Sequence, residues 1–292
     1  MRVKRGRLIA ALCIAAAAVS AVMTMCGAWE RIFKLLGYKE DLNSPSSATV
    51  SFLSVGAADC CILSSAGRHM MIDCGGDEAD GAAVKYMDLN GIERLDILFI
   101  THFDSDHSEL LPQIAENVEI GKIVTAQPFE SSGEELTAYA VQNGIEVEYA
   151  EAGEEYRLGE FSAVALSPSY EHNTDNDNSL VLRLEAFGKK MLFTGDVSDE
   201  VEQELLSSGA ELDCDILKVA HHGSHHSSSD DFLSAVSAEY AVVSVGDNGY
   251  GLPSLETLRR IESSGAQVLR TDRLGSVSFT LTENEITVKT EY

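Results

Sequence analysis

Positively charged residues are scarce in this sequence. Among its 292 residues, 21 are Lys or Arg and 47 are Asp or Glu, so the formal net charge is −26. Affinity for nucleic acid that does not depend on base sequence comes mainly from Lys and Arg side chains that neutralise phosphates. Because the sequence shows no basic nucleic-acid face, its composition argues against a protein that binds DNA non-specifically.

Cysteine is also sparse, and none of the six cysteines has the paired spacing of a thiolate zinc site. Cys60 and Cys74 flank a hairpin that is expected to turn at Ala66-Gly67, so they can face each other across antiparallel strands. Outside the cytoplasm this arrangement permits a disulfide. Burial of both as small apolar side chains explains the pattern equally well.

Only one apolar stretch is long. Four cations in the first seven residues precede an uncharged run of 22 residues, Leu8–Trp29, which is long enough to cross a bilayer as a helix. With these charges on its N-terminal side, the rest of the chain is expected outside the cytoplasm. Val19-Ser20-Ala21 offers a cleavage site. Residues 1–29 are therefore predicted to be a cleaved signal peptide or a membrane anchor, so the protein is expected to be secreted or membrane-attached.

One domain is predicted after this segment. Residues 30–47 are expected to be a linker ending in a stretch rich in Asn, Ser and Pro, and residues 48–292 contain no second linker. Strand and helix patterns alternate in two halves, which indicates an α/β fold, the αββα four-layer sandwich. Strands are expected at Val50–Val55, Cys60–Leu63, Met70–Asp73, Leu95–Ile100, Ile123–Ala126, Phe161–Leu166, Leu180–Leu184, Lys190–Phe193, Asp215–Val219, Tyr240–Val245 and Val268–Arg270. Helices are expected at Ala82–Leu89, Glu134–Gln142, Val197–Leu206, Asp231–Val236 and Ser254–Ser263.

Four potential metal ligands directly follow one of these apolar strands. They are His102, Asp104, Asp106 and His107. A strand end can aim alternate side chains at one point, and the loop beyond it can return the last two residues to that point. Imidazole together with carboxylate suits Zn or Mn better than Ca or Mg. The alternative is a polar turn in which Asp106 caps the next helix.

Residues of the same chemical types recur after two later strands. These are Asp196 and the pair His221-His222. Taken alone, Thr194-Gly195-Asp196 is typical of a turn, and two adjacent histidines are typical of an exposed or core pair. Together with the first motif they predict that the side chains converge on one edge of the sandwich and hold two divalent ions.

The ordered series of motifs over residues 48–283 resembles the metallo-β-lactamase superfamily. The resemblance is closest to the branch that includes the extracytoplasmic nuclease-like domain of the ComEC DNA-uptake proteins, because Asp104 stands where many other members carry His. The segments that carry the resemblance are Val55–Asp59, Ile72–Gly75, His102–His107, Asn178–Leu182, Thr194–Asp196, Lys218–Ser224, Asn248–Pro253 and Thr271–Asp272.

Some loop residues depart from the pattern of this branch. Ser54, Ala57 and Ala58 replace residues of its opening motif. Leu252 stands where a His normally precedes the late Pro, and Ser108–Leu111 replaces a Gly-Gly pair. The expected metal ligands are all retained. These loops are expected near the rim of the site, so the departures are expected to change which substrate is bound.

The resemblance implies that six ligands divide between two ions, Zn or Mn. The first ion would take His102 and Asp104, and the second would take Asp106, His107 and one late histidine, which we assign to His222. Asp196 would bridge the two ions. A water activated between them would attack the substrate, so Asp106 and Asp196 are expected to be catalytic as well as ligating.

Substrate contacts are expected beside this centre. His221 would face the substrate and donate a hydrogen bond to a phosphoryl oxygen or a proton to the leaving group. Asn178, Lys218 and Ser224 are the candidate substrate-binding residues. Alternatively, Asn178 belongs to a polar turn and Lys218 is a solvated lysine at a strand edge.

These residues predict an extracytoplasmic hydrolase that depends on two metal ions. A phosphodiesterase is the favoured function, and a DNA nuclease of the ComEC type is its narrower form. One alternative is another hydrolase on the same scaffold, which opens a lactone, lactam or thioester or removes choline phosphate from a cell-surface polymer. The other is a surface protein that binds metal without catalysis. The expected partners are a phosphodiester or other small substrate, DNA in the nuclease case, and the membrane through residues 1–29, and the sequence indicates no protein partner.

Overall fold

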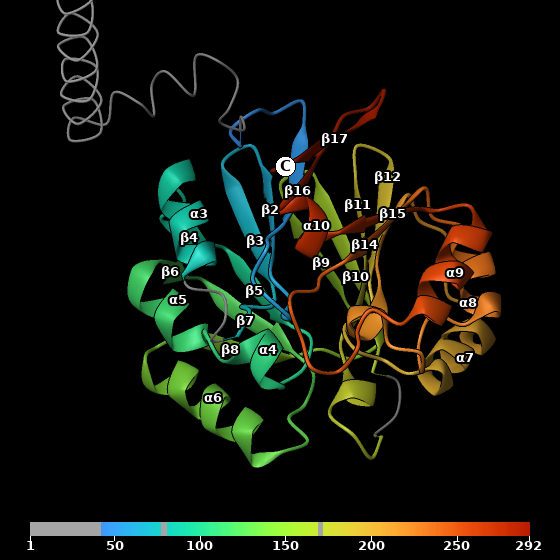
Figure 1. Ribbon diagram of the computed structural model, residues 1–292. Coiled ribbons are helices and arrows are strands. Elements are labelled where there is room, and N and C mark those ends of the chain that lie inside the picture. Colours follow the sequence, from blue (N-terminus) through green and yellow to red (C-terminus); the bar gives the residue numbers. More distant parts are fainter. Residues whose placement is uncertain (1–41, 77–80, 169–171) are drawn as a thin grey trace, which may run out of the picture. The chain divides into compact units, whose positions relative to one another are not determined.

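Two β-sheets pack face to face in the computed structural model, which describes residues 42–76, 81–168 and 172–292 (Figure 1). The first sheet has the strand order β17 (Ile286–Thr290), β16 (Val277–Leu281), β1 (Ala48–Phe52), β2 (Cys61–Ser65), β3 (Arg68–Ile72), β5 (Ile97–Ile100), β7 (Lys122–Thr125) and β8 (Glu146–Tyr149). The second has the order β15 (Gln267–Arg270), β14 (Tyr240–Val243), β13 (Ile216–Lys218), β12 (Lys189–Phe193), β11 (Val181–Ala186), β10 (Phe161–Ser167) and β9 (Glu155–Leu158). A small parallel sheet pairs β4 (Arg94–Leu95) with β6 (Glu119–Ile120).

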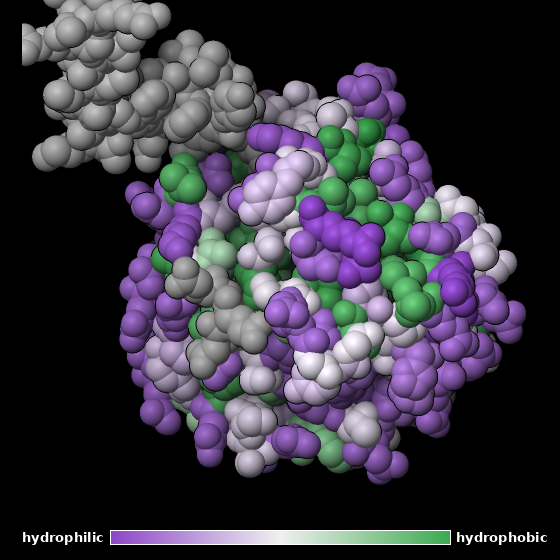
Figure 2. Space-filling view, viewed as in Figure 1, coloured by the Kyte–Doolittle hydropathy of each residue, from purple (hydrophilic) through white to green (hydrophobic). Residues whose placement is uncertain are grey.

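Helices cover the outer face of each sheet (Figure 1). The first sheet carries α3 (Ala82–Asn90), α5 (Leu111–Asn117) and α6 (Ser131–Gln142). The second carries α7 (Asp199–Ser208), α8 (Asp230–Val236) and α9 (Leu255–Ser264). Shorter helical segments are α4 (Ser105–Ser108), η2 (Asn176–Asn178), η3 (Ala220–Gly223) and α10 (Thr271–Leu274). Figure 2 shows hydrophilic residues over the outward sides of the flanking helices, as expected for helices whose other side packs on a sheet.

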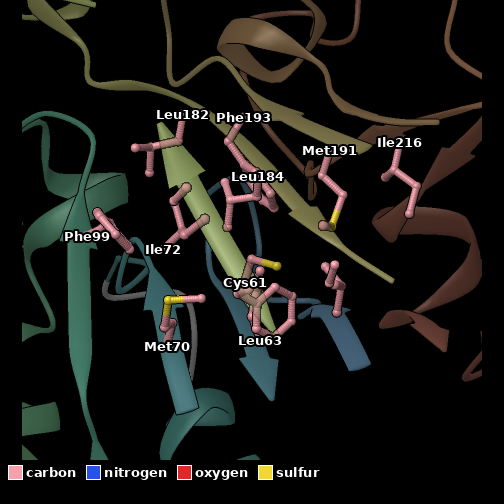
Figure 3. Close-up of a cluster of buried hydrophobic side chains, with 14 of the residues drawn as sticks. Cys61, Leu63, Met70, Ile72, Phe99, Leu182, Leu184, Met191, Phe193 and Ile216 are labelled. Atoms are coloured by element: carbon pink, nitrogen blue, oxygen red, sulfur yellow. The ribbon is translucent and has the colours of Figure 1, made fainter. Parts of the chain in front are cut away.

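The core between the sheets follows from the two-residue period of the strands. Met70 and Ile72 of β3 point inward and meet Leu182 and Leu184 of β11, as Figure 3 shows. Residues between them in sequence, such as Met71, point outward and pack under the helices. Each sheet is therefore buried on both faces, which requires four layers. The αββα sandwich predicted from the sequence is confirmed.

Several elements differ from the sequence prediction. The first strand ends at Phe52, so the predicted residues 53–55 belong to the loop that leads toward Asp59. The prediction missed strands β8, β9, β16 and β17 and helix α5. Three of these strands, β8, β9 and β17, are short and largely exposed or half-buried, so neighbouring strands rather than a buried face determine their pairing. In contrast, β16 alternates buried and half-buried residues, a signal that was present in the sequence.

The predicted leader or anchor at residues 1–29, and the linker up to residue 41, lie outside the described residues. Within the described ranges, none of the helices combines the length and the apolar character that crossing a bilayer requires. The cysteines there, Cys60, Cys61, Cys74 and Cys214, are buried free thiols. Cys60 and Cys74 pack into the apolar cluster under the helices of the first sheet, so the structure supports their reading as buried apolar side chains.

Candidate metal centre

The predicted ligands meet at one edge of the sandwich, because each follows a strand that ends there. His102 comes two residues after β5, and Asp196 follows β12 of the other sheet. His221 and His222 lie in η3, just after β13. Strands β12 and β13 are parallel, so the segments beyond their carboxyl ends lie side by side. Figure 1 shows α4, which carries Asp106 and His107, at the same edge.

The segment of the two late histidines has an unusual backbone. His221 has φ 50° and ψ 48°, and His222 has φ 51° and ψ 25°, so both lie in the left-handed region. Non-glycine residues there cost on the order of 1 kcal/mol or more each and cluster at functional sites. The bend brings the His221 amide to within 3.2 Å of the Asp196 Oδ1 atom, which accepts its hydrogen bond.

Three imidazoles share one orientation, with Nδ1 held by the protein and Nε2 directed to the site. The His222 Nδ1–H donates to the Ser244 carbonyl over 2.8 Å. The Nδ1 of His107 lies 3.0 Å from Asp73 Oδ2, and that of His102 lies 3.1 Å from Thr101 Oγ1. Such contacts through the second ring nitrogen orient histidine ligands in metal proteins.

Two of the Nε2 atoms have no hydrogen-bond partner among the described residues. These are the Nε2 atoms of His102 and His107, and both are buried. A buried polar atom without a partner is costly and needs an explanation. A metal ion explains both, since imidazole nitrogen is a ligand for Zn and Mn.

Carboxylates complete the donor set. Asp196 spans two imidazoles, with Oδ1 3.4 Å from His107 Nε2 and Oδ2 3.5 Å from His222 Nε2. Asp106 Oδ2 lies 3.1 Å from the same His222 nitrogen. At the other end of the cluster, Asp104 Oδ2 lies 3.7 Å from His102 Nε2. Asp196 thus contacts two of the side chains predicted to hold the second ion, and its role as a bridge to the first ion stays a prediction.

The carboxylates and imidazoles of the centre shift one another's pKa values. Burial opposes ionisation of Asp196, but His107 and His222 hold the pKa of Asp196 well below its usual value. Burial also opposes ionisation of Asp106, and the hydrogen bond with His222 helps to lower its pKa to about 2. For His107, burial favours the neutral ring, but Asp196 and Asp73 raise its pKa well above the usual value. The carboxylates thus need neighbouring positive charge, which a bound metal ion would supply.

One member of the geometric cluster was not predicted as a site residue. Donor atoms of Asp59, His107, Asp196 and His222 all lie within 4.8 Å of one another. The Asp59 Oδ2 atom lacks a hydrogen-bond partner of good geometry among the described residues, as the two imidazole nitrogens do, but it forms a close ion pair with the Lys218 Nζ, 2.5 Å away. We therefore regard Asp59 as the partner of Lys218. The available signal was that Asp59 is the residue retained at the end of the altered motif Val55–Asp59.

A second missed residue is Asp73, which orients the first ligand motif. Its carboxylate accepts hydrogen bonds from the Thr101 backbone amide at 2.8 Å and from the Thr101 hydroxyl, and it also holds His107. Asp73 itself has a positive φ of 58°. The sequence placed Asp73 in the motif Ile72–Gly75 but gave it no role.

The centre opens into a cleft of roughly 790 Å³. The predicted residues that line it are Asp104, Asp106, Asp196, His221, His222 and Ser224. His221 is 35% exposed and has its Nε2 4.0 Å from Asp196 Oδ2, whereas His222 is almost completely buried. This arrangement supports His222 as the ligand and leaves His221 facing the cleft. Burial lowers the pKa of His221, so its ring is neutral near pH 7.

Two predicted substrate-binding residues do not line this cleft. Lys218 is buried beneath the centre in contact with Asp59. The amide of Asn178 bonds within its own loop, to the backbone of His172 and Thr174. That loop supports the first ligand motif, because Asp175 accepts a hydrogen bond at 2.9 Å from the amide of Phe103, which lies between His102 and Asp104.

Comparisons with known proteins show the family of this chain. The sequence pattern of the metallo-beta-lactamase superfamily matches residues 53–247. Competence protein ComA of Neisseria gonorrhoeae is 32% identical over 252 residues, which cover 84% of this chain and 34% of that protein. ComE operon protein 3 of Bacillus subtilis is 29% identical over 200 residues, covering 67% and 26%. The chain thus spans about a quarter to a third of the length of these relatives.

A solved structure has the same fold. It is the metallo-beta-lactamase fold protein YhfI of Bacillus subtilis, with a TM-score of 0.56 and 10% sequence identity. The match covers 81% of this chain and 100% of the YhfI chain. At this identity the likeness concerns the fold alone.

Proposed function

The chain belongs to the metallo-beta-lactamase superfamily, in the branch of the competence proteins, and on that premise we propose that it is a metal-dependent phosphodiesterase. The observation that supports this best is that the Nε2 atoms of His102 and His107, assigned to different ions, are both buried without a hydrogen-bond partner among the described residues. The two rings lie side by side with centroids 4.1 Å apart, which suits two neighbouring ions, and sites with two ions recur in phosphatases and nucleases.

Six side chains would hold the ions: His102, Asp104, Asp106, His107, Asp196 and His222. The chemistry that two such ions supply when bound is a lowered pKa for water and positive charge beside the phosphoryl oxygens. Asp73 and the Ser244 carbonyl keep the rings of His107 and His222 in the orientation that this requires. The site is thus organised before substrate enters.

His221 is the residue that would act on the substrate directly. Its ring lines the cleft and is neutral near pH 7 because burial lowers its pKa. A neutral imidazole is a poor acid but a good hydrogen-bond donor. We therefore propose that His221 donates a hydrogen bond to a phosphoryl oxygen, and Ser224 lies in the same cleft to bind the substrate.

For the substrate, we propose a small diester in preference to long DNA. Among the described residues that line the cleft there is no Lys or Arg, whereas Glu109 and Asp247, which are not proposed metal ligands, are acidic. A long polyanion would therefore gain little charge neutralisation there. The matches cover only about a quarter to a third of the related competence proteins, so most of each relative has no counterpart in this match.

We also propose that the domain lies outside the cytoplasm, secreted or attached to the membrane. Support comes from the four cations before Leu8–Trp29. Protease added to intact cells should then degrade residues 48–292. Protection of these residues until the cells are lysed would place the domain in the cytoplasm.

The activity can be tested with the full chain, stripped of metal and reloaded with Mn, Zn or Mg. We expect hydrolysis of bis(p-nitrophenyl) phosphate with Mn or Zn, loss of this activity in Asp196→Ala, and its retention in the control Asp199→Ala, whose side chain is exposed on α7. Rapid opening of nitrocefin without diester cleavage would favour another hydrolase. Metal binding without any hydrolysis would favour a binding protein.

A further inference from the structure

The loop at residues 246–253 forms one wall of the cleft and is internally fixed. The Asn248 side chain donates to the carbonyls of Gly246 and Leu252, each at 2.9 Å. Its Oδ1 atom accepts from the amides of Tyr250 and Leu252, each at 3.1 Å. Four hydrogen bonds from one side chain give this exposed loop a defined shape.

The same loop is packed against the histidine segment. The Ser254 amide donates to the Gly223 carbonyl over 2.9 Å. A Cβ at Gly223 would lie only 2.5 Å from the Pro253 Cβ, so Pro253 packs directly on the Gly223 backbone and leaves no room for a side chain there. Because Gly223 directly follows His222, the position of the loop relative to the metal centre is fixed.

This fixed loop presents an aromatic ring at the cleft. Tyr250 is 88% exposed, and it lines the cleft together with His221 and His222. An exposed ring on a flexible loop would not by itself indicate a binding site, because large side chains at surfaces are common. An exposed ring that a hydrogen-bonded loop holds at the mouth of a catalytic cleft is suited to stack on a flat ligand.

The charge of the cleft restricts that ligand. Apart from the proposed metal ligands, the acidic residues that line the cleft are Glu109 and Asp247, and the described lining residues include no Lys or Arg. Beyond the metal centre, the lining has no permanent cation for a second phosphate, and its further imidazoles are those of His225 and His226. This lining favours an uncharged group next to the reacting phosphate.

From these features we propose that Tyr250 forms a stacking subsite for a nucleobase, so that the preferred substrate is a diester with one phosphate joined to one nucleoside. The inference rests on the proposed phosphodiesterase function and specifies its substrate class. Stacking suits this role because every base has a flat face, and a single base needs no cationic groove.

Two esters with the same leaving group and the same single charge test the subsite. They are thymidine 5′-(p-nitrophenyl phosphate) and methyl p-nitrophenyl phosphate. We expect the wild-type kcat/KM to be about tenfold higher for the thymidine ester, which lies within the range that base stacking on an aromatic ring contributes. Tyr250→Ala should remove this preference, and Tyr250→Trp should retain it. The control Tyr292→Ala removes another exposed tyrosine that does not line the cleft and should keep the wild-type ratio.

The outcomes separate the two proposals. Hydrolysis of both esters with equal kcat/KM, or a ratio unchanged by Tyr250→Ala, would overturn the subsite and leave the phosphodiesterase intact. If neither ester were hydrolysed, the proposed phosphodiesterase activity would be rejected. Binding then decides the subsite, because thymidine 5′-methyl phosphate should quench the fluorescence of the Tyr250→Trp variant more than dimethyl phosphate does. Equal quenching by the two would overturn it.

Discussion

The Lys218 ammonium lies 2.5 Å from the Asp59 carboxylate, and both side chains are about 5% exposed beneath the metal centre. The same ammonium is 3.3 Å from the Gly195 carbonyl and 3.8 Å from Asp196 Oδ1. Burial would lower the pKa of Lys218, but Asp59 and Asp196 raise it above the usual value. The lysine therefore stays charged and belongs to the support of the centre.

Removing this lysine should destabilise the fold. Lys218→Met leaves Asp59 as a buried charge without its partner, and breaking a buried pair in this way costs about 3–5 kcal/mol. We expect a corresponding fall in the free energy of unfolding, measured by urea denaturation of metal-free protein. Lys218→Met/Asp59→Leu should recover most of the loss, because no unpaired charge remains.

A surface pair provides the matched control. Lys122 and Glu148 also lie 2.5 Å apart, but their side chains are 27% and 36% exposed. Lys122→Met should cost less than about 1 kcal/mol, since water solvates the carboxylate that remains. Equal losses of unfolding free energy in the two Lys→Met variants would show that burial does not make the Lys218–Asp59 pair more costly to break.

The ligand assignment predicts a specific loss of metal. Asp196→Ala removes the carboxylate that contacts both His107 and His222. Dialysed protein should then hold less metal than wild type by elemental analysis, and circular dichroism should remain unchanged. If Asp196→Ala kept both its metal content and its hydrolytic activity, Asp196 would not be a ligand.

Asp73 should act through the orientation of His107. Asp73→Asn weakens the acceptor that holds the Nδ1 of this ring, 3.0 Å away. Substitutions of such partners typically lower metal affinity by about 10–100-fold. Competition with a chelator of known affinity measures the change. Asp96→Asn serves as the control because Asp96 binds the backbone amide of His69 at the other end of β3.

Proton competition should make metal binding depend on pH. Burial opposes charge on His107 and His222, but nearby carboxylates raise the pKa of both rings. A raised pKa stabilises the metal-free fold below about pH 6.5, the usual histidine value, and this contribution is lost as the pH rises through the raised values. Metal needs the neutral rings. The rise in Tm on adding Mn or Zn should therefore be larger at pH 8 than at pH 6. An equal rise at both would contradict the assignment, and Asp196→Ala should show little rise at either.

The sequence contained enough information to predict which side chains meet at the candidate metal centre but not which residues support them. His102 and Asp106 follow a strand with the spacing of a metal motif, so local order reveals them. Lys218 is the last residue of β13, and its sequence position does not show that its side chain is buried. Its partner Asp59 is remote in sequence. Only the packing of the two sheets brings them together, so the sequence favoured a solvated lysine at the strand edge, which the structure shows to be wrong.

The strands, like the site residues, could be predicted from the sequence only in part. Strands buried on both faces, such as β5 with the sequence Ile97–Ile100, appear in the sequence as apolar runs. Edge strands such as β8 and β9 carry glutamates and are half exposed, so no apolar face identifies them. Their pairing with β7 and β10 arises from the sheet that is already formed.

The acidic rim should limit the use of long DNA, and reversing one charge tests this. Asp247 is exposed in the Tyr250 loop and lines the cleft. Asp247→Lys replaces repulsion of flanking phosphates with attraction, so kcat/KM on an oligonucleotide should rise several-fold at low salt. The gain should fade by about 0.5 M salt, where screening acts within about 4–5 Å. Activity on methyl p-nitrophenyl phosphate, which has no flanking phosphate, should change far less. Glu283→Lys makes the same change of charge in the turn between β16 and β17, away from the cleft lining. If it raised oligonucleotide cleavage as much as Asp247→Lys, net charge rather than the rim would limit activity on DNA.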